Sequence, residues 1–197
     1  MITGSHPNRR ELLMLVAAAG LLPASGLPAS GLAASGLRAG AADGSQTGPA
    51  RPSAIGPSDG ELVFVGRDPV RIKVGPPGGQ GRFGMITQEV SAGTSIPVHL
   101  HEREDEIIFI QSGRGEATLG EDRVMLEAGS ALFVPQGTWH GGRNTGSGVL
   151  QWIAIYSPSG FERYFREIGR RSLDESQRTL TAEERQARDD RFGIRYR

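Results

Sequence analysis

The chain has 197 residues, 37% of them hydrophobic and 22% charged, a balance typical of a globular domain with a sizeable core. Basic and acidic residues number 22 each, so the net charge is zero. This balance argues against the excess of positive charge that is typical of nucleic-acid-binding proteins. Cysteine is absent, and this excludes disulfides, cysteine nucleophiles and thiolate metal ligands. We therefore expect no nucleic-acid partner and a chemistry that depends on other side chains.

The first 41 residues are arranged as an export signal. Arg9 and Arg10 precede an uncharged, mostly apolar run at residues 12–22, which is shorter than the roughly 18 apolar residues that a membrane span requires. The paired arginines resemble the bacterial twin-arginine signal, and residues 39–41 match the small-residue pattern of a cleavage site. We expect residues 1–41 to direct the chain to the periplasm or out of the cell, leaving no stable membrane anchor. The alternative is an ordinary buried helix at this end of the chain.

The chain changes character near residue 60. Residues 42–60 are rich in Gly, Pro and Ser and are expected to form a flexible lead-in. From residue 61, short apolar runs alternate with Gly, Pro and Asp, which predicts an all-β sandwich or barrel over residues 61–158. The predicted strands lie at residues 62–65, 70–74, 83–90, 95–101, 106–111, 116–119, 123–126, 131–134 and 149–156.

Residues 159–197 are expected to form a C-terminal helical tail. Ser159 and Glu162 have the spacing of a capping box, and Thr181 and Glu184 have the same spacing ahead of a charged stretch. The first predicted helix carries apolar residues at helical intervals, namely Phe161, Tyr164, Phe165 and Ile168. Core packing is the preferred interpretation of these apolar side chains.

Two of the predicted strands are apolar on both faces. These strands are residues 107–110 and 153–155, and the interior of a barrel can cover only one face of each. Soluble monomers rarely leave a large apolar patch exposed, and two-fold dimers are the commonest soluble assembly. We therefore expect a homodimer in which the outer strand faces pack together. The competing possibility is that residues 61–74 fold back over the patch.

Three of the four histidines fall in the predicted barrel. His99 and His101 are two apart in a strand, so both imidazoles point to one face. Two imidazoles side by side on an inward face are costly unless something bridges them, and a divalent transition metal does so. His140, after a turn and a short apolar strand, is the other histidine outside the signal and is expected to join the site.

A carboxylate near the histidine pair is expected to complete the ligand set. Glu106 opens the next predicted strand, which holds its side chain at a fixed inward angle, whereas the acids of the preceding loop can turn to solvent. We therefore prefer Glu106, with Glu104 as the runner-up. Imidazole suits Fe, Cu, Ni and Zn, and the added carboxylate extends the range to Mn.

These residues stand in two longer patterns with fixed spacing. The patterns are Gly93-x5-His99-x-His101-x4-Glu106-x6-Gly113 and Gly129-x5-Pro135-x-Gly137-x2-His140-x3-Asn144. Both match the motifs of the cupin superfamily at every defining position, so residues 60–160 resemble a small single-domain bacterial cupin. The beginning of the tail is more loosely similar to cupins related to quercetinase.

The resemblance implies a fold and a metal site. The fold is a double-stranded β-helix, or jelly roll, with a short C-terminal helical segment. The implied ligands of one divalent transition metal are His99, His101, Glu106 and His140. The motif glycines, Pro135 and Asn144 then serve as turn residues and not as chemical ones.

A centre with three nitrogen ligands and one oxygen ligand leaves one or two positions open on a five- or six-coordinate ion. We therefore expect a metal-dependent oxygenase or oxidase acting on a small organic molecule, with a lyase or isomerase as the variant. Because no histidine remains for proton transfer, Glu106 is the expected acid–base group, with a metal-bound oxygen or a tyrosine as alternatives. The competing class is a non-catalytic module that binds a small molecule or a metal.

About two of five candidate wall residues are expected to face the metal: Phe109, Met125, Phe133, Trp139 and Trp152.

Overall fold

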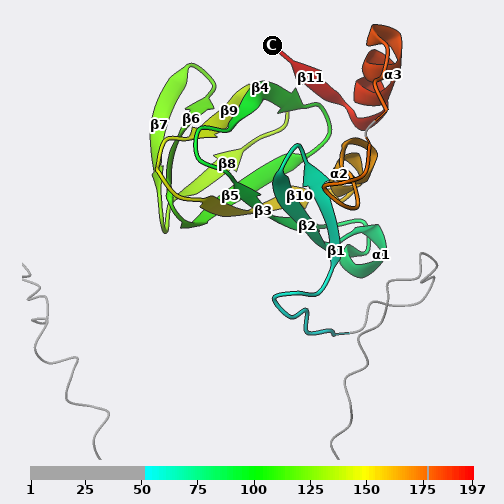
Figure 1. Ribbon diagram of the computed structural model, residues 1–197, viewed down its shortest axis with the longest axis horizontal. Helices are drawn as coiled ribbons and strands as arrows, with labels where there is room; N and C mark the ends of the chain where they lie inside the picture. Colours follow the sequence, from blue (N-terminus) through cyan, green and yellow to red (C-terminus); the bar gives the residue numbers. More distant parts are fainter. Residues whose placement is uncertain (1–51, 177) are drawn as a thin grey trace, which may run out of the picture. The chain divides into compact units, whose positions relative to one another are not determined.

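The computed structural model describes residues 52–176 and 178–197 (Figure 1). The predicted export signal at residues 1–41 lies outside the described residues, as does most of the expected lead-in. The described end of the lead-in runs against Lys73, whose ammonium donates hydrogen bonds to the carbonyls of Gly56, Pro57 and Asp59 at 2.7–2.8 Å. No helix in the described part of the chain is long and apolar enough to cross a membrane.

Strands dominate the described residues, with three short helices beside them. The strands are β1 (Glu61–Val65), β2 (Asp68–Val74), β3 (Gly84–Val90), β4 (Ser95–His101), β5 (Asp105–Ser112), β6 (Arg114–Leu119), β7 (Asp122–Glu127), β8 (Ala131–Val134), β9 (His140–Asn144), β10 (Leu150–Ser157) and β11 (Ile194–Tyr196). The helices are α1 (Pro76–Gly79), α2 (Glu162–Ile168) and α3 (Ala182–Phe192). The all-β fold class with a short C-terminal helical segment is thereby confirmed.

The strands form two antiparallel sheets that face each other as a barrel (Figure 1). One sheet has the order β1-β2-β3-β10-β5-β8 and the other has the order β11-β4-β9-β6-β7. Each predicted strand has a counterpart, whereas β9 and β11 were not predicted. β9 carries two glycines in place of an apolar run, and a Cβ at Gly141 would lie 3.0 Å from the Ile96 carbonyl oxygen on β4. The close approach of β4 and β9 therefore requires a residue that carries no strand signal.

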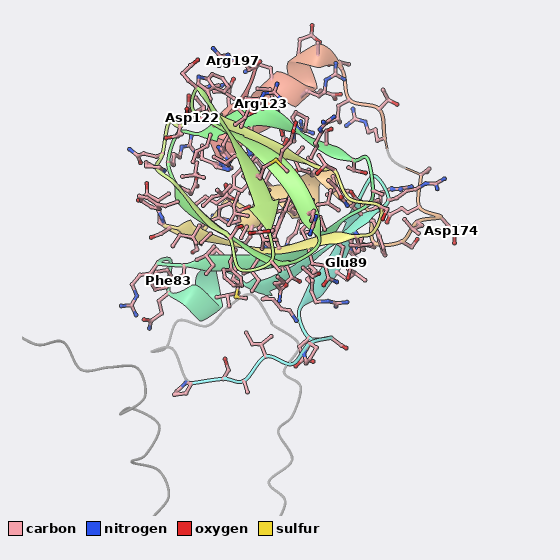
Figure 2. All side chains as sticks on the ribbon, turned by 90° about the vertical axis from the view of Figure 1, so that its left-hand side faces the viewer. Phe83, Glu89, Asp122, Arg123, Asp174 and Arg197 are labelled. Atoms are coloured by element: carbon pink, nitrogen blue, oxygen red, sulfur yellow. The ribbon has the colours of Figure 1, made fainter. Side chains whose placement is uncertain are left out.

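The space between the sheets holds two apolar clusters. The first joins β1, β2, β3 and β10 to the C-terminal segment, with Val63, Ile72, Ile86, Phe161, Tyr164 and Ile194 among its members. The second fills the other end of the barrel, with Val90, Ile110, Leu126, Leu132, Leu150 and Trp152 among its members. The C-terminal segment therefore belongs to the core of the barrel. Figure 2 shows side chains filling the barrel, with Phe83 and Asp174 at the surface, where both are exposed.

The two helix starts predicted in the tail have different outcomes. The Thr181 hydroxyl accepts the Glu184 N–H at 3.2 Å and the Glu184 carboxylate accepts the Thr181 N–H at 2.9 Å, which confirms that capping box. The Ser159 capping box is wrong, because α2 has Phe161 as its N-cap without a side-chain cap. Glu162 instead accepts the N–H of Gly160 at 2.8 Å, within the turn before the helix.

The outer face of the six-stranded sheet carries an apolar patch. The register aligns Ile155 of β10 with Ile107 of β5, and Ile107 with Phe133 of β8. Ile107 and Phe133 are 44% and 61% exposed, and Phe109 next to them is 42% exposed. β1 and β2 extend this sheet beside β3 and do not fold over the patch, so the competing fold-back of residues 61–74 is not observed.

Candidate metal centre

The four predicted ligands come from three strands of the two facing sheets. His99 and His101 lie on β4, and His140 lies on β9 directly opposite His99 in the register. Glu106 lies on β5 in the other sheet. All four residues are at most 9% exposed, so the barrel encloses the cluster.

The side chains converge on a small volume. One ring nitrogen from each of His99, His101 and His140 lies within 4.8 Å of the others, a grouping that could hold a metal ion. The Oε2 atom of Glu106 lies 2.9 Å from His140 Nε2 and 3.4 Å from His101 Nε2. The structure thus brings together all four residues that the sequence selected.

Backbone carbonyls orient two of the imidazoles. The Nδ1 atom of His99 lies 2.8 Å from the Pro97 carbonyl oxygen, and that of His140 lies 2.9 Å from the Thr138 carbonyl oxygen. A carbonyl oxygen can only accept, so both Nδ1 atoms carry the hydrogen and both Nε2 lone pairs are turned toward the cluster. This second hydrogen bond is the usual means of fixing the tautomer and ring angle of a metal-binding histidine.

Several polar atoms at the centre of the cluster have no hydrogen-bond partner among the described residues. They are both ring nitrogens of His101, Oε2 of Glu106 and Nε2 of His140. The close approach of Glu106 to His140 does not have hydrogen-bond geometry, although their atoms are 2.9 Å apart. Buried polar atoms are rarely left unsatisfied, and lone pairs that face one point suit a cation. The residues therefore fit a bound metal ion.

The local electrostatics also suit a cation. Burial, followed by the neighbouring His140 and His101, lowers the pKa of His99 to about 3, so that its lone pair stays available. Burial alone would raise the pKa of Glu106, but the adjacent His101 and His140 rings outweigh burial and lower it. The carboxylate of Glu106 in turn raises the pKa of His140 against the effect of burial.

Glu104 lines a different hollow of the molecule from Glu106. It is 6% exposed, but it lines a second hollow with Ser159 and Gly160, and its Oε1 lies 3.9 Å from the position that a Cβ on Gly160 would take. Burial, together with the charges of Glu162 and Glu106, raises the pKa of Glu104 to about 7 despite the opposing charge of Arg103. The geometry therefore favours Glu106 as the carboxylate of the cluster.

The cluster opens into a cavity of about 410 Å³. Its walls are mostly apolar and include Ile96, Ile108, Leu126, Leu132, Trp152 and Phe161. Of the five wall residues predicted from the sequence only Trp152 lines the cavity, so the expected number of two is wrong. Phe109, Met125 and Phe133 are 42%, 71% and 61% exposed. Residues two apart on a strand share a face, so the inward Glu106 already implied that Ile108 points inward and Phe109 outward.

Three tyrosines line the cavity that were not predicted from the sequence as wall residues, namely Tyr156, Tyr164 and Tyr196. Tyr156 could have been found, because it follows Trp152 and Ala154 at strand spacing on the buried face of β10. Tyr196 could not, because it reaches the cavity only through the pairing of β11 with β4. Burial and the charge of Glu106 raise the pKa of Tyr156 well above its usual value, so its hydroxyl keeps its proton.

The family comparison agrees with this geometry. Residues 86–156, from β3 to β10, match the family model described as a cupin domain. The barrel has the double-stranded β-helix fold, and its central strands resemble this domain. The motif glycines Gly93, Gly113, Gly129 and Gly137 all have positive φ values, between 75° and 90°, as turn residues of the fold should. The C-terminal wall of the cavity lies outside the matched residues.

Several curated proteins resemble parts of this chain. The chain is 32% identical over 82 residues to the uncharacterized protein YrkC of Bacillus subtilis (strain 168), covering 39% of this chain and 44% of that protein. It is 26% identical over 120 residues to quercetin 2,3-dioxygenase of the same organism, covering 61% and 35%. It is 35% identical over 63 residues to an oxalate-binding protein of Thermotoga maritima, covering 32% and 52%. The chain thus spans 35–52% of the length of these relatives.

Two solved structures share the fold. KdgF from Halomonas sp. superposes with a TM-score of 0.51 and 21% identity, covering 57% of this chain and 99% of that one. A protein described as a predicted oxalate decarboxylase from Thermotoga maritima superposes with a TM-score of 0.51 and 20% identity, covering 54% and 99%. At this level of identity the likeness shows the fold alone, and function must be argued from the site.

Proposed function

We propose that this cupin is an exported, metal-dependent oxygenase or oxidase of a small organic molecule. The main support is the cluster of side chains that the barrel encloses, namely His99, His101, His140 and Glu106. This cluster lies at the wall of a mostly apolar cavity of about 410 Å³. A cavity of this size and lining suits one small apolar or aromatic ligand. The similarity of part of the chain to quercetin 2,3-dioxygenase supports this choice of reaction class.

The protein side chains have separate tasks in this proposal. A bound Fe, Mn, Ni, Cu or Zn ion supplies Lewis acidity and, for the redox-active metals, one-electron chemistry with dioxygen. The histidines hold that ion, and the carbonyls of Pro97 and Thr138 keep two of their rings in position. Glu106 is the acid–base group that takes or returns a substrate proton. Tyr156 beside it stays protonated, because burial and the charge of Glu106 raise its pKa, and it serves as a hydrogen-bond donor.

The first experiment is metal analysis of the mature protein from its native host, followed by oxygen uptake with quercetin and smaller hydroxylated aromatics. We expect about one transition metal per chain, and metal-dependent oxygen consumption with at least one of these compounds. The His99→Ala, His101→Ala double variant is the control and should consume none. Full metal occupancy in that double variant would rule out the proposed centre.

A non-catalytic binding function is the second candidate. It is favoured by the similarity to the oxalate-binding protein, which is 35% identical over the matched residues. A binding cupin would keep the metal and take up a small ligand without turnover. Saturable ligand binding by metal-loaded protein, with unchanged ligand recovered and no oxygen consumed, would favour this candidate over the oxygenase.

A further inference from the structure

Strand β11 forms one wall of the cavity that the candidate metal ligands line. β11 pairs with β4 so that Tyr196 lies opposite His99 and Ile194 lies opposite His101. The ring of Tyr196 is centred 5.9 Å from the ring of His99, and both residues line the cavity. Figure 1 shows β11 beside β4, with α3 leading into it. A residue outside the matched cupin domain therefore stands next to the candidate metal ligands.

Hydrogen bonds anchor this strand on both sides of Tyr196. The Glu102 N–H donates to the Gly193 carbonyl at 2.7 Å, and the Arg197 N–H donates to the Val98 carbonyl at 3.0 Å. The Arg195 guanidinium also pairs with the Glu102 carboxylate at 2.7 Å. The backbone of Tyr196 is therefore held in place before any ligand arrives, and such preorganisation lowers the entropy cost of binding.

The hydroxyl of Tyr196 takes part in a directed chain of hydrogen bonds. Asp189 is paired with the Arg188 guanidinium at 2.8 Å, and an ionised carboxylate only accepts hydrogen bonds. Tyr164 donates its single hydroxyl proton to Asp189 at 3.3 Å. With the Tyr164 proton on Asp189, the Tyr196 hydroxyl, 2.9 Å from that of Tyr164, donates between the two tyrosines. Its proton is used in this bond, and its oxygen lone pairs remain available as acceptors.

We propose that the Tyr196 hydroxyl oxygen is a specificity subsite that accepts a hydrogen bond from a hydroxyl or amino group of the ligand. The inference rests on the proposed small-molecule function of the same cavity and narrows its substrate class. The ligand is a small molecule with an apolar body that carries a hydrogen-bond donor on the side facing β11. An ether or ester at that position can only accept, so it leaves the oxygen of Tyr196 without a partner. Tyr196 is 44% exposed, so this cost arises when a bound ligand covers the hydroxyl and leaves it unpaired, which is how a site rejects a near-identical analogue.

The test compares two probes that differ in one donor. Resorcinol has two hydroxyls, while 3-methoxyphenol keeps one and replaces the other with a methyl ether. Affinities are measured by calorimetry on the full chain loaded with zinc, a metal without redox chemistry, so the result does not depend on oxygenase activity. We expect wild-type protein to prefer resorcinol about fivefold, the value of one neutral hydrogen bond. In Tyr196→Phe that preference should disappear, with zinc content unchanged.

A second variant separates recognition from a merely structural role. Tyr164→Phe removes the acceptor of the Tyr196 proton but leaves the Tyr196 oxygen in place. The Tyr196 hydroxyl can then donate, so 3-methoxyphenol should bind more tightly than it binds to wild type, while resorcinol keeps its affinity. The proposal is overturned if wild-type protein binds the two probes equally or not at all. An equal loss of both probes in Tyr196→Phe also overturns it, because that result is expected of a packing residue. Absence of oxygen uptake with intact probe preference would count against the oxygenase alone.

Discussion

At the scale of single residues, the cluster depends on how each imidazole is held. His99 combines a lowered pKa with an Nδ1 atom committed to a backbone carbonyl, so its Nε2 lone pair is available across the physiological pH range. Glu106 reaches the histidines from the opposite sheet. The cluster is therefore a bridge between the two sheets, and its members are not interchangeable with the acids of the neighbouring loop.

We expect His99→Ala to weaken metal binding by at least about 10–100-fold, because even loss of a supporting contact typically costs that much. Glu106→Gln should lose metal as well, since it removes the charge that faces His101 and His140. Glu104→Gln is the matched control, and titration with a chelator under identical conditions gives the affinities. Normal affinity in Glu106→Gln together with loss in Glu104→Gln would reverse our choice of carboxylate.

The raised pKa of Glu104 predicts a pH-dependent stability. Its pKa is about 7 in the folded protein against an ordinary value of 4.5, so the folded state binds the extra proton and loses stability as the pH rises through this window. Relative to wild type, Glu104→Gln should unfold at the same urea concentration well below pH 4.5, where the carboxyl is protonated in both states. By pH 8 it should be more stable by roughly 1–3 kcal/mol, allowing for partial solvent screening. Urea denaturation at several pH values measures this, and a pH-independent difference would contradict it.

At the scale of elements, the C-terminal segment is part of the barrel. Phe161 and Tyr164 of the α2 region and Ile194 of β11 are each at most 3% exposed and join the cluster formed by β1, β2, β3 and β10. Arg103, in the loop between β4 and β5, donates to the carbonyls of Asp190 and Arg191 at the end of α3. The loop that separates His101 from Glu106 is thereby tied to the tail.

Ile194→Ala should therefore destabilise the protein by about 2–5 kcal/mol, the usual cost of truncating a buried aliphatic side chain. Leu173→Ala, at a side chain that is 51% exposed in the same C-terminal segment, is the control and should change stability by about 0.5 kcal/mol or less. The free energy of unfolding is obtained from urea titration. Equal effects of the two substitutions would show that the tail does not contribute to the core as described.

At the scale of the whole molecule, the outer face of the six-stranded sheet remains uncovered in the described residues. We propose that a second copy covers it, as a two-fold dimer formed by the β5 and β8 faces. The exposed residues Ile107, Phe109 and Phe133 are apolar, so the face is complementary to itself. Light scattering should give twice the mass of the mature chain, and Phe109→Glu should give a folded monomer. A stable wild-type monomer at micromolar concentration would contradict this.

The predicted export also concerns the whole chain. We propose that the twin-arginine route carries the folded, metal-loaded barrel across the membrane, with its metal chosen in the cytoplasm. Replacing Arg9 and Arg10 with lysine should leave the precursor in the cytoplasm, because the guanidinium pair is the recognised feature. Cell fractionation and immunoblotting measure this, with Arg38→Lys as the control. Unchanged export of the double variant would favour the general secretory route.

The sequence alone was enough to find nine of the eleven described strands and the four residues of the cluster. Strand periodicity places His99 and His101 on one face, and a strand begins close to Glu106, so their common direction follows from local geometry. The turn glycines required by the cupin pattern all adopt positive φ. The same periodicity, applied to β5, would have corrected the choice of Phe109 as a wall residue. These features depend only on neighbours in the chain, which is why they could be predicted.

Only the tertiary structure decided what surrounds the cluster. Glu104 and Glu106 differ by two positions, and their separate surroundings depend on the turn at Gly160, which the sequence does not place beside them. Tyr196 meets His99 because the chain returns through α3 and adds β11 to β4, a pairing between positions far apart in sequence. Local sequence patterns do not predict such pairings, because the pairings are stabilised by contacts that form only when the whole barrel closes. The four residues of the candidate metal centre could therefore be predicted from the sequence, while most walls of the adjoining cavity could not.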